Sequence, residues 1–320
     1  MTQARRAWSA LALLVVVDLV MIPDFHRIAW VGGAWRGLPI DILEHGARLC
    51  LVAIGAALVV ATGGVDLGIG TVMALSGALA ARLSAEGHGF PVVASAAIGI
   101  GVAVGLVNAA MVVVGRMPPI VATLVPMVAG RGVAHLVAGG AILAVDAPWA
   151  VRLGSGTWLG MPIAVWVATG VIAVVALLLR RTAVGAGLAA VGSNPAACRI
   201  AGVPSGRLIT LAYATSGTFA AIAGLLAAAD VRSADAHNLG QFVELDAVVA
   251  VVIGGTAISG GVFSLGGALA GALFLQTLTV TLHAAGVRSD VAPLPKALLV
   301  LVAAVVSHPQ FRIRRTRSAS

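Results

Sequence analysis

The chain has 320 residues, of which 60% are hydrophobic and only 10% are charged, and its formal net charge is +8. A soluble domain carries roughly a quarter charged residues because its surface must be hydrated, so the composition excludes a water-soluble globular fold. The basic residues gather at the two ends and in gaps between apolar runs, without a basic aromatic face, which argues against a nucleic-acid partner. A single membrane domain over residues 1–320 fits this content better than two soluble domains.

Ten segments are apolar enough to cross a lipid bilayer as helices, which takes about 20 residues each. They are 8–22, 47–62, 66–83, 91–114, 119–138, 163–179, 209–229, 246–260, 262–284 and 291–307. The first follows Arg5 and Arg6, but no small-x-small cleavage site precedes Asp24, which favours an uncleaved span over a signal peptide. The sequence therefore predicts an all-α, polytopic membrane helix bundle of about ten spans.

The charges indicate which loops face the cytoplasm. With the amino terminus placed inside, eleven of the 20 basic residues but only one of the 12 acidic residues, Asp66, fall on the inner side. The inner basic residues are Arg5, Arg6, Arg116, Arg180, Arg181, Arg199, Arg207, Arg312, Arg314, Arg315 and Arg317. This is the positive-inside pattern, and it predicts that both termini are cytoplasmic. Asp18, near the outer end of the first span, is interpreted as a helix end that reaches headgroup water.

Two glycine-rich breaks interrupt the apolar runs, at residues 63–70 and 254–261. They include Gly63 and Gly64 in the first half and Gly254 and Gly255 in the second. Paired glycine-interrupted segments in corresponding halves point to a transport pathway, since unwound backbone at membrane depth must line a cavity or be buried in protein. Close helix packing by small residues is the alternative, and the sequence leaves both open.

Motifs for catalysis are missing from the sequence. The single lysine, Lys296, lies in Pro-Lys-Ala rather than in a phosphate-binding Gly-Lys-Ser/Thr, and no His-Glu-x-x-His, Gly-x-Ser-x-Gly or Cys-x-x-Cys occurs. Gly185–Ala190 matches a loose dinucleotide fingerprint but follows a membrane segment rather than a strand. We therefore expect neither an enzyme nor a metal or cofactor site.

The longest inner connection, residues 180–208, is predicted to be a structured loop. Asn194 is a good helix N-cap, and Pro195 suits the first helical position. Gly202 suits the C-terminal stop, with Pro204 beyond it. The pattern predicts a helix of two turns on the inner face, which either docks in a partner's groove or simply joins two spans.

Three motifs carry a family resemblance that runs from about residue 38 to 305. Gly63-Gly64-Val65-Asp66-Leu67, the loop from Ala190 to Val203, and Glu244-Leu245-Asp246-Ala247 through Gly254-Gly255 resemble the permease subunits of ribose-type sugar ABC importers. Further stretches, among them 37–43, 128–134 and 228–236, are similar to the galactofuranose permease branch. The chain departs from the family pattern at Gly68, where a serine is usual, and at Ala109 after Asn108, where a glycine is usual.

The resemblance implies a type II ABC importer-like permease, in which two permease chains, identical or sister subunits, assemble with cytoplasmic ATP-binding subunits and a periplasmic sugar-binding protein in a bacterial inner membrane. It also implies that the 194–202 segment couples to the ATPase. The candidate coupling residues are Gly192, Asn194, Pro195, Ala197, Arg199 and Gly202. The candidate pathway residues are Gly63, Gly64, Asp66, Asn108, Arg131, Glu244, Asp246, Gly254 and Gly255.

Ionisable residues within spans usually face the bundle interior or a cavity. Arg131 is expected to neutralise Asp66 or Asp246, with direct sugar contact as the alternative. Glu244 and Asp246 either line the entrance and meet the binding protein or are solvated flank charges. Rival functions are an ion-coupled secondary transporter, a non-transporting membrane protein and a branched-chain amino acid permease.

Overall fold

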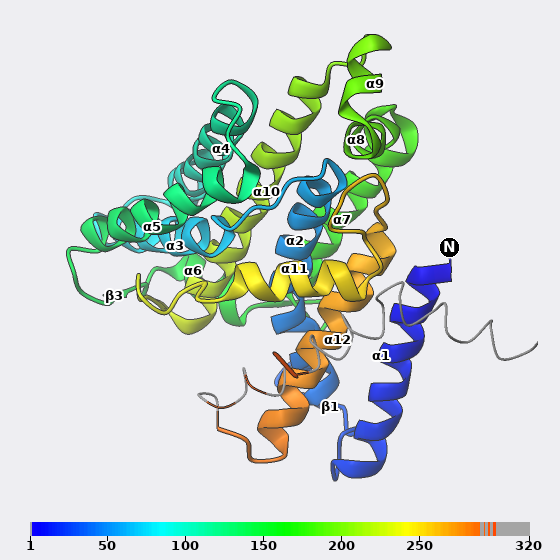
Figure 1. Ribbon diagram of the computed structural model, residues 1–320. Helices are drawn as coiled ribbons and strands as arrows, with labels where there is room; N and C mark the ends of the chain where they lie inside the picture. Colours follow the sequence, from blue (N-terminus) through cyan, green and yellow to red (C-terminus); the bar gives the residue numbers. More distant parts are fainter. Residues whose placement is uncertain (1, 289–290, 292–293, 295–296, 299–320) are drawn as a thin grey trace, which may run out of the picture.

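A computed structural model describes residues 2–288, 291, 294, 297 and 298 of the chain (Figure 1). Its helices are α1 (Thr2–Met21), α2 (Leu38–Ala61), α3 (Ile69–Ala85), α4 (Phe90–Val113), α5 (Pro119–Val137), α6 (Pro148–Ser155), α7 (Ile163–Arg181), α8 (Val184–Ser193), α9 (Pro195–Ile200), α10 (Ser205–Val231), α11 (Val243–Ile253) and α12 (Leu265–Ala284). The strands are β1 (Ala29–Val31), β2 (Ala34–Arg36), β3 (Leu143–Ala144), β4 (Thr157–Trp158), β5 (Met161–Pro162) and β6 (Ser233–Ala234). They form three antiparallel pairs, β1–β2, β3–β6 and β4–β5.

The prediction of an all-α polytopic membrane protein is confirmed. Within the described residues, six helices are long and apolar enough to cross a membrane: α2, α4, α5, α7, α10 and α12. Helices α1, α3 and α11 account for three more of the predicted segments. The tenth segment, 291–307, lies almost entirely outside the described residues.

Helix α11 is shorter than the sequence predicts. The apolar run over 246–260 was expected to be a complete span, but the helix has 11 residues and ends at Ile253. At 1.5 Å per residue it covers about 16 Å, roughly half of a hydrocarbon core. Residues 254–264 are non-helical, as are residues 62–68 between α2 and α3. Both predicted breaks therefore exist as irregular backbone, partly buried and partly exposed.

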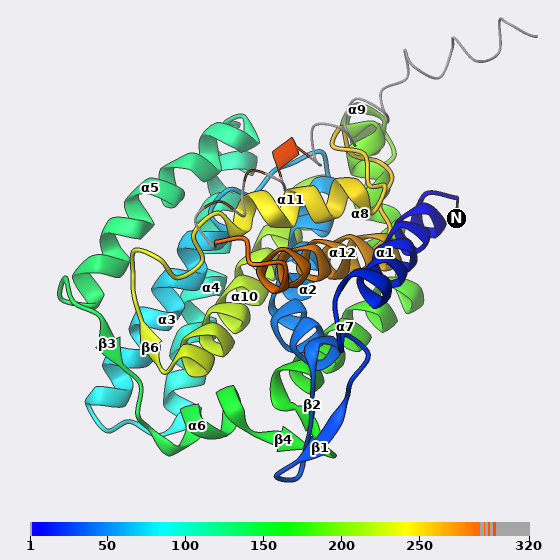
Figure 2. The same cartoon turned by 90° about the horizontal axis from the view of Figure 1, so that it is seen from below.

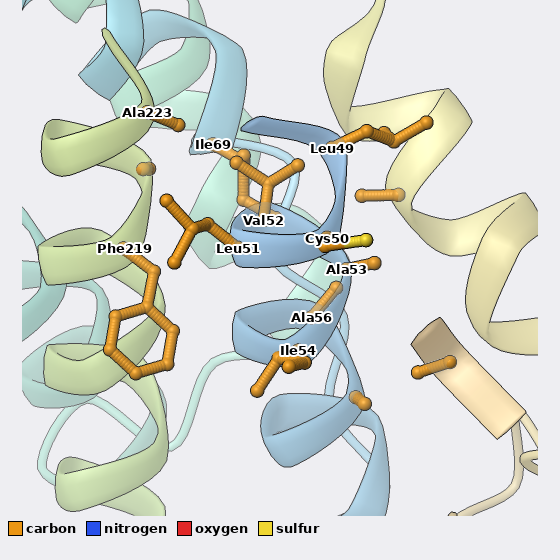
Figure 3. Packing of buried hydrophobic residues seen from close by; sticks show 14 of the residues in the cluster. Leu49, Cys50, Leu51, Val52, Ala53, Ile54, Ala56, Ile69, Phe219 and Ala223 are labelled. Atoms are coloured by element: carbon orange, nitrogen blue, oxygen red, sulfur yellow. The ribbon is translucent and has the colours of Figure 1, made fainter. Parts of the chain in front are cut away.

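Helices α2 and α10 form the centre of the bundle. Helix α10 packs on α2, α3 and α4, and α12 packs on α1, α2 and α11. Seen from below, α2 lies behind α12 and beside α10 (Figure 2). Leu51, Val52 and Ile54 of α2 form the core with Ile69 of α3 and Phe219 of α10 (Figure 3). All five side chains are buried, so the apolar face of each central helix is turned toward protein rather than lipid.

Small residues allow these helices to approach backbone to backbone. A methyl group placed on Gly101 of α4 would collide with the carbonyl oxygen of Gly217 in α10, and one on Gly217 would collide with that of Gly101. Without a hydrophobic driving force between helices in lipid, such close contact is a main source of association. The packing role of the glycines, left open by the sequence, is thus realised at this crossing.

The two ends of the bundle differ in character. One, which we call the α9 end, carries α8, α9 and both glycine-rich breaks. The other, the hairpin end, carries β1–β2, β4–β5 and α6 (Figure 2). Five of the six tryptophans belong to the hairpin end: Trp30, Trp35, Trp149, Trp158 and Trp166. Tryptophans gather at membrane–water interfaces, which fits a bundle that stands upright in a bilayer.

The sequence suggested that Asp18 marks a helix end that reaches headgroup water, and the structure places it elsewhere. It is fully buried between α1 and α12, where its Oδ2 accepts a hydrogen bond of 2.9 Å from the Thr281 hydroxyl. The interior position follows from the packing of α1 along α12, which the hydropathy of a single segment does not reveal.

Candidate coupling element and translocation pathway

Helix α9 is the predicted two-turn helix of the 180–208 loop. Asn194 caps it, with its Oδ1 accepting a hydrogen bond of 2.9 Å from the Ala197 amide, and Pro195 occupies the first turn. Gly202 follows the helix with φ of +72°, a left-handed conformation that suits glycine. The cap, the proline and the stop signal act as the sequence predicts.

Helix α9 projects from the bundle at the top of Figure 1. A six-residue helix is too short to be stable alone, and it is held by Cys198, whose side chain is buried, and by α8, whose Leu188 and Val191 are buried in the bundle. Its outer face is exposed, and the apolar side chain of Ile200 is 90% accessible. Asn194, Pro195, Ala197, Arg199 and Gly202 are all exposed on this projection, with Gly192 at its base. An apolar tip on a supported projection is suited to enter a groove on another protein.

The first break is held by a buried carboxylate. Asp66 is 4% exposed, and its Oδ2 accepts a hydrogen bond of 2.7 Å from Ser216 of α10. Its Oδ1 accepts bonds from the Gly68 amide, at 3.0 Å, and from Asn108 Nδ2 of α4, at 3.3 Å. Three donors satisfy the carboxylate, as a buried charged group requires. Because the Gly68 contact uses the backbone amide, it does not depend on the serine that the family pattern has at this position.

The carbonyl oxygen of Val65 adds a second set of bonds. It accepts hydrogen bonds from the Tyr213 hydroxyl of α10, at 3.2 Å, and from the Thr123 hydroxyl of α5, at 3.4 Å. A methyl group on Gly64 would lie 2.7 Å from the Tyr213 hydroxyl oxygen, so a glycine is needed for this approach. The Gly-Gly-Val-Asp motif thus forms an irregular segment tied to α4, α5 and α10.

Of the two carboxylates expected to be neutralised by Arg131, Asp66 is not its partner, because the Asp66 oxygens are bound by Ser216, Asn108 and the Gly68 amide, and pairing with Asp246 stays a prediction. Arg131 Nη1 instead donates hydrogen bonds to the carbonyl oxygens of Leu239, at 2.8 Å, Ala236, at 3.1 Å, and His237, at 3.4 Å. The guanidinium of α5 therefore fixes the loop that leads into α11. The sequence could not show this, because backbone carbonyls are acceptors at every residue and carry no signature.

Arg131 and Glu244 share a cleft of about 370 Å³ between α3, α5 and the start of α11. The lining residues are Thr71, Met127, Val128, Arg131, Gly132, His237, Gln241, Phe242 and Glu244. Glu244 is 4% exposed, and within the described residues its Oε2 has no hydrogen-bond partner. A cleft of this size with a few convergent polar groups has the form of a small-molecule site. Its donors and acceptors suit a neutral polyhydroxylated ligand.

Asp246 lies apart from this cleft. It lines a second cavity, of about 400 Å³, together with His45, Arg48 and Gln276. Arg48 of α2 forms an ion pair of 3.0 Å between its Nη1 and Asp230 Oδ2 of α10. Sequence reasoning missed Arg48 and Asp230, although both are ionisable residues within or beside predicted spans and the rule applied to Arg131 would have found them.

The predicted pathway residues thus fall in separate places. Gly63, Gly64, Asp66 and Asn108 belong to the first break, whereas Arg131 and Glu244 line the cleft. Asp246 lines the second cavity, and Gly254 and Gly255 begin the second break. Gly254 lies against the backbone of Gly267 in α12, where no side chain would fit.

Comparison with known proteins identifies the class of this bundle as a transport permease. The model of the family described as "Branched-chain amino acid transport system / permease component" matches residues 38–306. The chain therefore belongs to this permease family. No solved structure gives a significant match.

Among its curated relatives, the chain is 41% identical to the galactofuranose transporter permease protein YtfT of Escherichia coli, over 94% of this chain and 89% of the relative. It is 36% identical to the fructose import permease protein FruF of Bifidobacterium longum, over 95% and 87% of the two chains. It is 33% identical to the ribose import permease protein RbsC of Escherichia coli, over 95% of each. The similarity therefore extends along nearly the entire chain rather than resting on isolated motifs.

Proposed function

We propose that this chain is the membrane-spanning permease subunit of an ATP-driven importer that carries a monosaccharide delivered by a periplasmic binding protein. The observation that carries the proposal is the sustained similarity to three sugar permeases over more than nine-tenths of the chain. The 41% identity to a galactofuranose permease favours a galactofuranose-like sugar or another pentose or hexose. The family description also allows a permease for branched-chain amino acids, but the similarity to sugar permeases makes this the weaker alternative.

In this proposal the α9 end faces the cytoplasm of a bacterial inner membrane, and both termini lie on that side. The positive-inside distribution of arginines supports this orientation. The exposed α9, with Asn194, Pro195, Ala197 and Arg199, docks in a cytoplasmic ATP-binding subunit. ATP hydrolysis then belongs to the partner, because this sequence has no phosphate-binding lysine motif. The hairpin end receives the sugar-binding protein, and a second permease, identical or sister, completes the pathway.

The cleft of Arg131 and Glu244 is proposed to line the sugar's route. Glu244 supplies carboxylate acceptors for sugar hydroxyl groups, and Gln241 and Thr71 offer further hydrogen bonds. Arg131 holds the wall of the cleft through its bonds to the loop over residues 236–239. A few polar groups, with Phe242 and His237 as the aromatic side chains of the lining, fit a route that must release its cargo rather than retain it.

Uptake by cells tests the function. We expect deletion of the gene to abolish uptake of one labelled sugar among D-galactofuranose, D-fructose and D-ribose, and re-expression to restore it. Uptake should persist when an ionophore collapses the proton gradient and stop when ATP is depleted. Loss of uptake on ionophore treatment alone would indicate an ion-coupled secondary transporter, and loss of leucine uptake would indicate an amino acid permease.

The Glu244→Gln variant tests the cleft, with Glu86→Gln as its matched control. Glu86 is exposed and pairs with Arg82, away from the cleft. We expect Glu244→Gln to slow sugar uptake or raise the half-saturating concentration, and Glu86→Gln to behave as the native protein. Equal uptake by the two variants would remove Glu244 from the pathway.

Cysteine labelling tests the orientation. Native Cys50 and Cys198 are both buried and can be replaced to give a silent background. A membrane-impermeant maleimide applied to intact spheroplasts should label Gly33→Cys, in the β1–β2 turn, but not Asn194→Cys. Labelling of Asn194→Cys from outside would reverse the proposed topology.

A further inference from the structure

Three segments that are distant in sequence meet through their backbones at the base of α9. They are residues 61–63 at the end of α2, 192–193 at the end of α8 and 260–261 in the loop before α12, and we call this meeting point the glycine junction. The Gly261 amide donates a hydrogen bond of 3.1 Å to the carbonyl oxygen of Ala61. A methyl group on Gly192 would collide with that same carbonyl oxygen and with the Gly261 nitrogen.

The remaining contacts of the junction are equally close. A methyl group on Gly260 would lie 2.7 Å from the Gly63 nitrogen and 3.1 Å from the Gly192 α-carbon. One on Gly261 would lie 3.2 Å from the Ser193 β-carbon. The nearest atoms around Gly192 and Gly260 are all backbone atoms, and the Ser193 side chain lies against Gly261, so few side chains are present to absorb a displacement by changing rotamer. The junction is partly exposed, at Gly63 and Ser193, but close packing of this kind transmits strain.

The junction lies between the docking element and both breaks. Gly192 is two residues before Asn194, the N-cap of α9. On one side, residues 61–63 lead to Asp66, whose bonds reach α4 and α10. On the other side, residues 260–261 belong to the break that follows α11, and the first turn of α11 carries Glu244 of the cleft. A displacement of α9 therefore has a contiguous path to the cleft through one short helix.

We infer that Gly192 is a positioning residue whose direct backbone contact transmits movement of α9 to the two breaks, so that the ATPase cycle opens and closes the cleft. This inference rests on the proposed function, since it assigns a mechanical role within that transport cycle. The junction moves as a unit: α9 pushes the 61–63 and 260–261 segments rather than sliding past them. A side chain at residue 192 would separate these segments and break the transmission.

The Gly192→Ala variant tests the inference, with Gly170→Ala as its matched control. A methyl group on Gly170, in α7, would meet no atom within 4 Å. Each permease is purified with its co-purifying ATPase subunit and reconstituted in proteoliposomes, and sugar transported is measured against ATP hydrolysed. We expect the ratio to fall about tenfold in Gly192→Ala, a typical size for coupling between two sites, while the ratio for Gly170→Ala stays native. An unchanged ratio in Gly192→Ala would overturn the inference.

A reversible cross-link gives an independent test should Gly192→Ala not assemble. In a background without Cys50 and Cys198, Ser193→Cys is combined with Gly261→Cys, because a β-carbon on Gly261 would lie 3.2 Å from that of Ser193, so a small separation of the two segments reaches the distance of a disulfide. Both the oxidised and the reduced forms of this variant carry the same substitutions. Equal transport by the two forms is expected of a junction that moves as a unit. Transport that stops on oxidation and returns on reduction would mean that the segments slide, which contradicts the inference.

The two tests separate the inference from the function on which it rests. If the native complex neither hydrolyses ATP nor transports a sugar, the proposed function fails. If the native complex transports and Gly192→Ala transports with the same ratio, only the role of the junction fails.

Discussion

The two glycine-rich breaks occupy corresponding places in the chain, yet they are held by different forces. Residues 62–68 are tied to three helices by the Asp66 carboxylate and the Val65 carbonyl oxygen. Residues 254–264 are held mainly by backbone proximity, with Gly254 against Gly267 and Gly260 against Gly63. Their side-chain bonds are local, from Ser264 and Thr256.

This difference in how the two breaks are held suggests that they have different roles. A segment fixed by a buried polar network has one low-energy arrangement, because displacing it would leave charged and polar groups without partners. A segment held by glycine contacts loses little hydrogen bonding when it shifts. We therefore expect the first break to be the rigid part of the pathway, which keeps its contacts with α4, α5 and α10 when the junction moves, and the second break, with α11, to be the part that changes its contacts. The following variants test this division, with stability measured as the free energy of unfolding in detergent micelles.

The largest effect is expected from Asp66→Ala. The change leaves the Ser216 hydroxyl, the Asn108 amide and the Gly68 N–H buried without their acceptor, which should lower the free energy of unfolding by about 4 kcal/mol. Asp66→Asn is the control, because it keeps the size and one acceptor oxygen and should lose less than half as much. Equal losses in the two variants would show that volume rather than hydrogen bonding holds the first break.

Gly267→Ala should have the next largest effect and acts on the second break. A methyl group there would collide with the Gly254 carbonyl group, so α11 and α12 must separate, which costs about 2 kcal/mol. Gly266→Ala is the adjacent control: its nearest neighbour would be Trp8 Nε1 at 4.0 Å, and it should be neutral or slightly stabilising. If both variants are neutral, α11 is not packed as closely on α12 as described.

Tyr213→Phe removes one hydroxyl group from the network of the first break. The ring is fully buried and stays in place, while the hydrogen bond to the Val65 carbonyl oxygen is lost. We expect this loss to lower the free energy of unfolding by about 1 kcal/mol. Combined with Asp66→Ala, the loss should be smaller than the sum, since both changes release the same segment. Strict additivity of the two changes would argue that they act on independent regions.

The smallest effect is expected from Ser264→Ala. The Ser264 hydroxyl caps α12 by accepting a hydrogen bond of 3.1 Å from the Gly267 amide. Losing this cap should reduce stability by about 0.5 kcal/mol, and Ser264→Asp should preserve it. A loss as large as that of Asp66→Ala would contradict the division between a rigid first break and a deformable second break.

Local patterns in the sequence were enough to predict α9, both breaks and nine of the helical segments. Asn194, Pro195 and Gly202 each act through neighbouring backbone, so their meaning can be read from adjacent residues. Long apolar runs must form helices in lipid, because only a helix satisfies its own backbone groups there. The end of α11 at Ile253 was missed because the apolar run continues past Gly254 and Gly255.

The sequence by itself determined that this chain is a helical membrane bundle with a short capped helix, α9, and two broken segments, because composition, periodicity and capping are properties of consecutive residues. Only the tertiary structure decided which groups meet: Arg131 with the loop before α11, Asp66 with Ser216 and Asn108, and Gly192 with the two breaks. Those contacts join residues dozens to more than a hundred positions apart. They depend on how the helices pack. The sequence does not show which residue a given glycine or backbone carbonyl group will contact.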